Sequence, residues 1–283
     1  MSARRGRQWG LLLAVVSGLI LGAGCNGGDQ PLQWRLLWES EFDGPAGRSP
    51  DPDHWRFDVG VDWGNEQLEY DTERLENVSL DGKGHLAITA RRETYTGSAG
   101  TREYTSGRIN TFDRFEQAGG KFEARIKLPR GRGLWPAFWM LGNDFARVGW
   151  PASGEIDIME YRGQDSGVVI GSLHGPGYSG GGAITGRVDT GLDLSTDFHV
   201  YAVEWFDDRI TWLVDDTPYQ TFSRASIPNG GDWVFDHPFA ILLNLAVGGR
   251  FVGPPDASTP FPQAMLVDWV RVYGWDQGSA VAP

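Results

Sequence analysis

Cysteine is nearly absent from the 283-residue chain, because Cys25 is the only one. An internal disulfide is therefore excluded, and so is a metal site built from paired cysteines. The motifs HExxH and GxxxxGK followed by Ser or Thr are also missing, so the sequence gives no support to zinc-dependent hydrolysis or to P-loop phosphate binding. Basic residues are scarce as well: 25 lysines and arginines stand against 37 acids, which disfavours nucleic acid and anionic surfaces as partners.

The first 24 residues have the composition of a targeting segment. Three arginines within the first seven positions precede LLLAVVSGLILGAG, an apolar run with the length of a signal-peptide core. Cys25 follows small residues and resembles the lipid-accepting cysteine of a bacterial lipoprotein, although Gly22 stands where leucine is usual. We expect export of the mature chain, either as a membrane-anchored lipoprotein or, with a plain signal peptide, as a secreted or periplasmic protein.

Loss of residues 1–24 would change the charge balance of the chain. It would leave 22 basic against 37 acidic residues, a formal charge of −15 in place of −12. A neutral polymer is not repelled by this charge, whereas a heavily sulfated one needs a local basic groove, which the sequence does not show. We expect no nucleic acid partner, a membrane contact only through a lipid on Cys25, and a monomer.

Short alternating stretches after residue 30 predict an all-β fold. The chain holds 40 Gly, 16 Pro and 13 Trp, and turn clusters such as LDGKG, PRGRG and IPNGGD separate the stretches. This pattern is typical of a two-sheet antiparallel sandwich with little helix. We expect a polar linker at residues 25–30, a single domain at 31–275 and a disordered tail at 276–283. The predicted strands include 85–92, 121–128, 199–206, 209–216, 239–247 and 265–273.

A further predicted strand, SGEIDIMEYRG at residues 153–163, carries three acids within six positions. Glu155 and Asp157 share one face because side chains alternate along a strand, and the two neighbouring isoleucines face the core. Glu160 is five positions from Glu155, which would turn it inward, so we expect a β-bulge near Met159. The bulge would place all three carboxylates on one solvent-facing surface.

The spacing of these acids suits the cleavage of a glycosidic bond. Four regular steps of about 3.3 Å separate the Cα atoms of Glu155 and Glu160 by roughly 13 Å, and side chains that lean together leave roughly 5 to 6 Å between the carboxylates. A gap of about 5 to 5.5 Å predicts hydrolysis with retention. Asp157 beside both would keep one glutamate protonated by repulsion and hydrogen bonding. A solvated acidic strand or a calcium site is the alternative interpretation.

Aromatic and polar residues near the acids are candidates for sugar binding. Trp135 and Trp139 share a strand face, and Trp150 lies shortly before the acids. Sugar rings stack on such side chains, although most tryptophans belong to a core. The polar candidates are Asn65, Arg108 and His174. Each has a structural alternative, such as pairing of the arginine with an acid or a histidine satisfied within the fold.

The acidic strand and its surroundings resemble glycoside hydrolase family 16. GEIDIMEYRG has the ExDxxE form of the family's active-site run, with WPAFWMLG before it and SLHGPGYSGG after it. The resemblance continues through SEFDG, WGNEQLEY, SGRINT, FHVYAVEW, NLAVGG and FPQAMLVDWVRVY, and so covers nearly the whole mature chain. Bacterial laminarinases are the members that it resembles most. It implies an all-β, two-sheet antiparallel β-jelly-roll sandwich with an open substrate cleft on the concave face.

The resemblance implies roles that spacing alone does not order. Glu155 would be the nucleophile, Glu160 the general acid and then base, and Asp157 an assisting carboxylate, with no cofactor for catalysis. The implied glucan contacts are Asn65, Arg108, Trp135, Trp139, Trp150 and His174.

A structural calcium ion on the convex face is also implied by the resemblance. Glu41, Gly84 and Asp268 occupy the matching places and would contribute carbonyl oxygens and one carboxylate. One departure concerns the loop after NLAVGG, where laminarinases usually continue with Asn-Trp-Pro and this chain has Arg-Phe-Val at 250–252. The change bears on subsite preference and leaves the three carboxylates intact.

The sequence thus predicts a retaining endo-hydrolase of β-1,3-glucan, with mixed β-1,3/1,4 chains as a further substrate. A galactan hydrolase of the agarase or carrageenase type, a glucan transglycosylase and a non-catalytic glucan-binding module are the alternatives. HGPGYSGG favours glucanases, and the three carboxylates disfavour a module that only binds. The partition of a covalent intermediate between water and a sugar acceptor does not follow from sequence.

Overall fold

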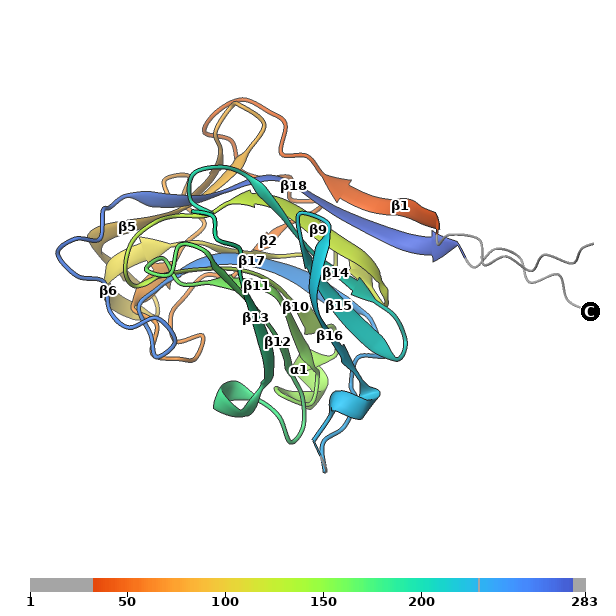
Figure 1. Ribbon diagram of the computed structural model, residues 1–283. Coiled ribbons are helices and arrows are strands. Elements are labelled where there is room, and N and C mark those ends of the chain that lie inside the picture. Colours follow the sequence, from red (N-terminus) through yellow and green to blue (C-terminus); the bar gives the residue numbers. More distant parts are fainter. Residues whose placement is uncertain (1–32, 229, 277–283) are drawn as a thin grey trace, which may run out of the picture. The chain divides into compact units, whose positions relative to one another are not determined.

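Strands make up about half of residues 33–228 and 230–276, the part of the chain that the computed structural model describes (Figure 1). The helices in this part are brief: α1 at Phe145–Val148 and the 3-10 helices η1 at Gly180–Gly182 and η2 at Arg224–Ser226. The strands are β1 Gln33–Ser40, β2 Arg56–Phe57, β3 Glu69–Asp71, β4 Val78–Leu80, β5 Leu86–Gly97, β6 Gly100–Ser106, β7 Arg108–Asn110, β8 Glu116–Gln117, β9 Gly120–Lys127, β10 Leu134–Gly142, β11 Glu155–Tyr161, β12 Val168–His174, β13 Ile184–Asp189, β14 His199–Trp205, β15 Arg209–Val214, β16 Thr217–Ser223, β17 Phe239–Val247 and β18 Gln263–Asp276.

The six stretches singled out by alternation are all strands, namely β5, β9, β14, β15, β17 and β18, so the prediction of an all-β fold is confirmed. None of the described helices is long and apolar enough to cross a membrane. The signal peptide, Cys25 and the linker lie outside the described residues, as does the tail from 277, so these remain predictions.

Two sheets form the two layers of the sandwich (Figure 1). The ten-stranded sheet runs in the order β16-β15-β14-β9-β18-β5-β6-β3, with β1 on β18 and β4 on β5. The eight-stranded sheet runs β13-β12-β11-β10-β17-β7-β2, with β8 on β17. Neighbouring strands pair antiparallel throughout, except that β3 and β6 are parallel. The fold is thus the expected two-sheet antiparallel sandwich, with one parallel pair at the edge of the larger sheet.

The hydrophobic core fills the space between the two sheets. On β9, Phe122, Ala124 and Ile126 alternate toward it and are fully buried, as the period of two predicts. Trp205 of β14 meets Phe239 of β17 from the opposite sheet, with ring centroids 5.2 Å apart. Burial of each such side chain stabilises the fold by about 1.5 to 3 kcal/mol.

The centre of the eight-stranded sheet is covered on both faces. All nine residues of β17 are buried, and β10 beside it is buried at every position except Trp139. One face of these strands packs on the core, and on the other face Trp135, Trp139 and Leu141 of β10 line a cavity. β17 supports β10 from the side, because the two strands pair along their whole length.

Candidate active site

A cavity of about 830 Å³ lies on the eight-stranded sheet. It is lined from β7, β10, β11, β12 and β13, and from the connections that follow β2, β10, β11, β12 and β17. Eight of the nine predicted catalytic and substrate-binding residues line it: Asn65, Arg108, Trp135, Trp139, Trp150, Glu155, Glu160 and His174. The ninth, Asp157, is buried beside it and contacts His174. The structure therefore brings together residues that are up to 109 positions apart in the sequence.

The predicted β-bulge is present on β11. Trp139 pairs with Asp157 and the preceding Phe138 pairs with Met159, so Ile158 has no partner on β10. The register with β12 shifts across the same residues. Because of this extra residue, Glu160 returns to the cavity side while the neighbouring apolar residues stay in the core.

A tryptophan from the opposite sheet contacts the bulge. Trp212 of β15 donates its indole N–H to the main-chain carbonyl of Asp157 at 2.7 Å. Gly171 on β12 leaves room for this indole, because a Cβ atom there would lie only 2.4 Å from the ring. The bulged main chain is thus held from across the core, and we expect any larger residue at 171 to disturb it.

The three carboxylates are more buried than expected. Asp157 is 4 % exposed, Glu160 is 9 % exposed, and the Glu155 side chain is 19 % exposed, which corrects the prediction of a solvent-facing surface. Burial is the main reason that the pKa of Glu155 rises to about 8 and that of Asp157 to about 7. It also raises the pKa of Glu160 well above its usual value, with repulsion by Asp157 as the second cause. The three groups therefore do not all ionise at neutral pH.

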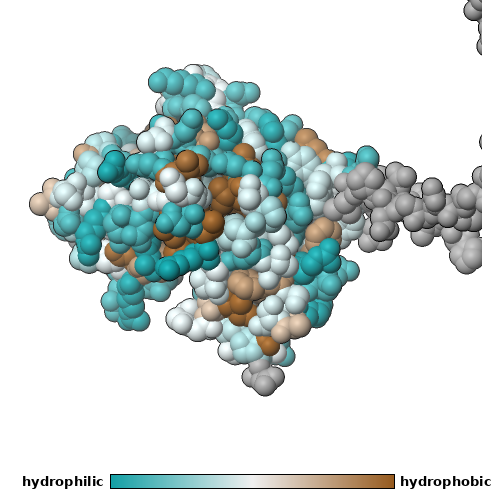
Figure 2. Space-filling model, viewed as in Figure 1, coloured by the Kyte–Doolittle hydropathy of each residue, from teal (hydrophilic) through white to brown (hydrophobic). Residues whose placement is uncertain are grey.

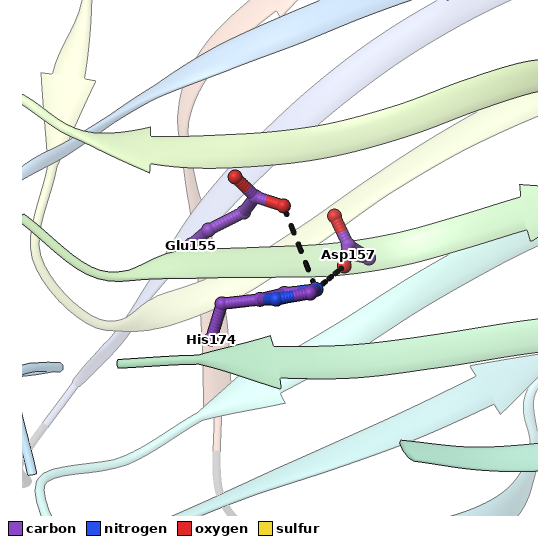
Figure 3. Close-up of side chains that lie close together, drawn as sticks. All are labelled: Glu155, Asp157 and His174. Carbon is purple, nitrogen blue, oxygen red and sulfur yellow. Dashed lines mark hydrogen bonds and ion pairs between the residues drawn. The ribbon is translucent and has the colours of Figure 1, made fainter. Parts of the chain in front are cut away.

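His174 connects two of the acids (Figure 3). Its Nε2 lies 2.9 Å from Asp157 Oδ2 and 3.6 Å from Glu155 Oε1. The main-chain N–H of Gly180 donates to Nδ1 at 3.1 Å, so Nδ1 carries no proton. The neutral imidazole then has its proton on Nε2 and donates it to Asp157. Rather than being free in the cleft, His174 is a fixed donor to the acids.

The same three residues offer the closest approach to a metal site among the described residues. One ligand atom from each of Glu155, Asp157 and His174 lies within 4.8 Å of the others. A metal at Nε2 would need the lone pair of that nitrogen, but the Gly180 hydrogen bond places the proton there. The geometry therefore favours two carboxylates that share a hydrogen-bond donor, His174, over a metal site at this position.

The two tryptophans of β10 differ in their contacts. Trp135 donates its indole N–H to Glu160 Oε1 at 3.0 Å and is buried, so its ring is largely covered. Trp139 donates to Asn244 Oδ1 at 2.8 Å and is partly exposed to the cavity. Of the two, Trp139 has more ring surface free for a sugar, whereas Trp135 mainly orients the carboxyl of Glu160.

Arg108 is held in place on three sides. Its Nε donates to Asp58 Oδ2 at 2.9 Å. Its guanidinium lies 4.7 Å from the ring centroid of Trp63 and 4.9 Å from that of Trp139. The pairing with an acid that the sequence left open is thus present, and the residue lines the cavity as well.

The loop at 250–252 packs against the acid end of the cavity. The ring centroids of Phe251 and Trp135 lie 4.8 Å apart. The guanidinium of Arg162 also contacts Phe251, 4.2 Å from its ring centroid. Arg250 pairs with Glu66 at 2.6 Å. The Arg-Phe-Val departure therefore builds a small second cluster behind Trp135.

The expected calcium ligands have other partners. Arg271 donates to the two carboxylate oxygens of Glu41 at 2.8 and 3.1 Å. Arg125 pairs with the carboxylate of Asp268. A guanidinium beside the Asp268 carboxylate repels a cation. These pairs do not involve the main-chain carbonyl oxygens expected from Glu41 and Gly84, so the calcium site stays a prediction.

Three aromatic cavity residues, Trp63, Phe145 and Phe251, and the charged Arg162 were not among the predicted site residues. Arg162 lies two positions after Glu160, so alternation could have indicated it. Trp63 belongs to the quoted WGNEQLEY stretch but lies in the connection between β2 and β3, where alternation does not apply. Phe145 and Phe251 belong to connections between strands, where no periodicity signals which side a residue faces.

Comparisons with known proteins agree with this geometry. Residues 58–271 match the family described as glycosyl hydrolases family 16. The chain belongs to this family. A family 16 relative named "Beta-glucanase" from Rhodothermus marinus is 42% identical over 95% of each chain. "Glucan endo-1,3-beta-glucosidase" from Cryptopygus antarcticus is 38% identical over 86% of this chain and 93% of its own length. The endo-beta-1,3-glucanase structure from Pyrococcus furiosus aligns with a TM-score of 0.82 and 46% identity, over 86% of this chain and 95% of its own.

Proposed function

We propose that this family 16 protein is an endo-acting β-1,3-glucanase that cleaves with retention of configuration. The observation that carries the proposal is the bulge in β11, through which Glu155 and Glu160 line the same cavity. A pair of glutamates on one face of a cleft is the arrangement that double-displacement glycoside hydrolysis requires. The names of the relatives support β-1,3-glucan as the substrate.

In the first step Glu155 is the nucleophile and Glu160 is the acid. The Glu155 carboxylate bonds to the anomeric carbon as the bond to the leaving oxygen breaks, and Glu160 gives its proton to that oxygen. Burial keeps Glu160 protonated, and the Trp135 N–H fixes the orientation of its carboxyl. Positive charge on Arg108 favours the ionised form of Glu155.

In the second step a water molecule releases the sugar. Glu160, now ionised, takes a proton from the water, whose oxygen bonds to the anomeric carbon and frees the Glu155 carboxylate. Asp157 lies between the glutamates in sequence and accepts a hydrogen bond from His174 Nε2. Its carboxylate thus stays beside both glutamates during the two steps. No cofactor takes part in either step.

Hydrolysis of laminarin, measured as released reducing ends, tests the proposal. We expect activity from the natural chain and none above background from Glu155→Gln. Mixed β-1,3/1,4-glucan, agarose and carrageenan in parallel reactions separate the glucanase from a galactan hydrolase. Product sizing with an added sugar acceptor separates hydrolysis from transglycosylation, and binding without product would favour a recognition module.

The proposal includes export and attachment to a membrane through a lipid on Cys25. Its support is the sequence of residues 1–25, which lie outside the described part of the chain. Detergent phase partition of the natural chain and of Cys25→Ala tests it. We expect the natural chain in the detergent phase and the variant in the aqueous phase. A monomer is expected on gel filtration of the soluble form.

A further inference from the structure

Exposed apolar side chains gather on the connection between β10 and β11. Among the described residues, seven large apolar side chains are exposed, and three of them lie within six positions here: Phe145 at 41 %, Val148 at 36 % and Trp150 at 44 %. The other four are scattered: Leu36, Val59, Leu75 and Leu192. Figure 2 shows apolar surface at the lower end of the molecule, an end that α1 and the segment after β16 share in Figure 1. A local group of this kind indicates a binding surface.

The connection is firmly attached to the domain. Asp144 precedes α1 and pairs with Arg147 at 2.7 Å, and its other oxygen lies 3.3 Å from His237 Nε2. The main chain of Asn143 donates to the carbonyl of Pro238 at 3.0 Å. The α1 turn is therefore a fixed support, and its exposed side chains are presented in a defined position.

Two of the three exposed side chains belong to the cavity. Phe145 and Trp150 line it together with Glu155, whereas Val148 does not. Trp150 lies beside His174, with ring centroids 5.9 Å apart, and so is close to the acids. Among the described residues Phe145 forms no ring pair with another aromatic side chain, so no aromatic partner covers its ring.

A glycine-rich segment borders the cavity beside Trp150. Gly180 and Gly181 line the cavity, and a Cβ atom on Gly180 would lie 3.9 Å from the Trp150 ring, so Gly180 lies next to this ring. A Cβ atom on Gly181 or Gly182 would meet nothing within 4 Å. The cavity is therefore open at Gly181, where no side chain fills it.

We propose that Phe145 is a stacking platform for one more glucose unit of the bound chain, beyond the unit that contacts Trp150. The proposal rests on the proposed function, because the occupant is a stretch of the same β-glucan. A pyranose ring has an apolar face of C–H groups that covers an aromatic ring and removes it from water. Phe145 lines the same cavity as Glu155 and Glu160, so a sugar chain bound at the acids can reach it. This favours a glucose unit over a partner protein as the occupant.

Binding of defined β-1,3-linked oligosaccharides tests the platform. The protein carries Glu155→Gln so that the ligand is not consumed, and titration calorimetry gives Kd for the disaccharide, tetrasaccharide and hexasaccharide. Adding Phe145→Ala should weaken the hexasaccharide about 3- to 10-fold, as expected for one lost aromatic stacking contact, and leave the disaccharide unchanged. Phe145→Trp should restore or exceed the affinity of the parent.

Val148→Ala is the matched control, because it removes an exposed apolar side chain from the same α1 turn without touching the cavity. It should change no Kd, and thermal melting should show both alanine variants folded. An equal loss for all three ligands, no loss for any, or the same loss from Val148→Ala would overturn the platform. Failure of the parent to bind any of the ligands would instead overturn the proposed function, and the platform with it.

Discussion

Two groups of buried carboxylates lie on two strands of this domain, and they share most of their chemistry. Glu69 and Asp71 on β3 are two positions apart, as Glu155 and Asp157 are on β11. Both β3 acids are only 2 % exposed. Burial raises the pKa of Glu69 to about 7 and that of Asp71 well above its usual value, as it does for the acids of β11.

Access to the cavity is what separates the two groups. Glu155 and Glu160 line the cavity, whereas neither β3 acid does, and Glu69 accepts the main-chain N–H of Val247 at 2.8 Å. Arg108 lowers the pKa of acids in both groups, so its charge does not distinguish them. A raised pKa thus identifies burial, and reactivity needs an open side as well.

The largest effect is expected from removing the nucleophile. Glu155→Gln should lower kcat on laminarin by about 10⁴-fold or more, because no covalent intermediate forms. Glu69→Gln removes an equally buried carboxylate but keeps the acceptor for Val247, so kcat should stay within about threefold. Initial rates of reducing-end release measure both. A large loss of kcat from Glu69→Gln would show that access to the cavity does not separate the β3 acids from the β11 acids.

Removal of the acid should be the next largest effect. Glu160→Gln should slow cleavage of laminarin by about 10² to 10⁴-fold, because the leaving oxygen is no longer protonated. An aryl glycoside with an activated leaving group needs less protonation and should partly escape. The ratio of kcat/KM for the two substrates is the measurement, and an equal loss on both would show that Glu160 is not the acid.

Asp157→Asn should shift the pH profile of kcat/KM and also lower the rate at the optimum. The charge of Asp157 raises the pKa of both Glu155 and Glu160, so its removal lowers both. The rise of kcat/KM, which follows ionisation of Glu155, and the fall, which follows ionisation of Glu160, should then both move to lower pH. The rate at the optimum should fall by about 10- to 100-fold. A profile with unmoved limbs would contradict this coupling.

Glu69 of β3 should make the free energy of unfolding depend on pH. Glu69 has a folded pKa of about 7 against 4.5 as its ordinary value, so the folded state binds its proton more tightly. Stability is therefore lost as pH rises from 4.5 to about 7, by about 3 kcal/mol, and is constant above that. Glu69→Gln should flatten this fall in urea unfolding curves recorded across the range. An unchanged slope would mean that Glu69 does not titrate within it.

The smallest effect concerns carboxylates that already have partners. Asp268, the one carboxylate of the expected calcium site, already pairs with Arg125, so removal of calcium with EDTA should change Tm little. Differential scanning calorimetry with and without added calcium measures this. A rise in Tm with calcium would support the structural calcium site that the resemblance implies.

Much of the fold and the carboxylate arrangement could be predicted from sequence because both depend on a period of two. Alternation located β9 and β17, and the odd spacing of Glu160 required the bulge that β11 contains. These are properties of one strand and its immediate neighbours. A reader of the sequence can apply the same rule to each strand in turn.

Burial of the acids could not be predicted in this way, because distant segments create it. Trp135 of β10 and His174 of β12 cover the acids, and Phe251 closes on Trp135 from a loop about a hundred positions away. Pairing of Asp268 with Arg125 is equally non-local. The period along a strand says which way a side chain points but not what lies opposite it.

The central claim is that Glu155 forms the covalent bond to the sugar while Glu160 supplies the proton. Mass spectrometry of peptides after incubation with an activated 2-deoxy-2-fluoro β-1,3-glucoside tests it most directly, because such a substrate accumulates as the glycosyl-enzyme. We predict one added sugar on the peptide that contains Glu155, and none when Glu155→Gln is treated in the same way. An adduct on any other residue, or inverted product with no adduct, would contradict the account.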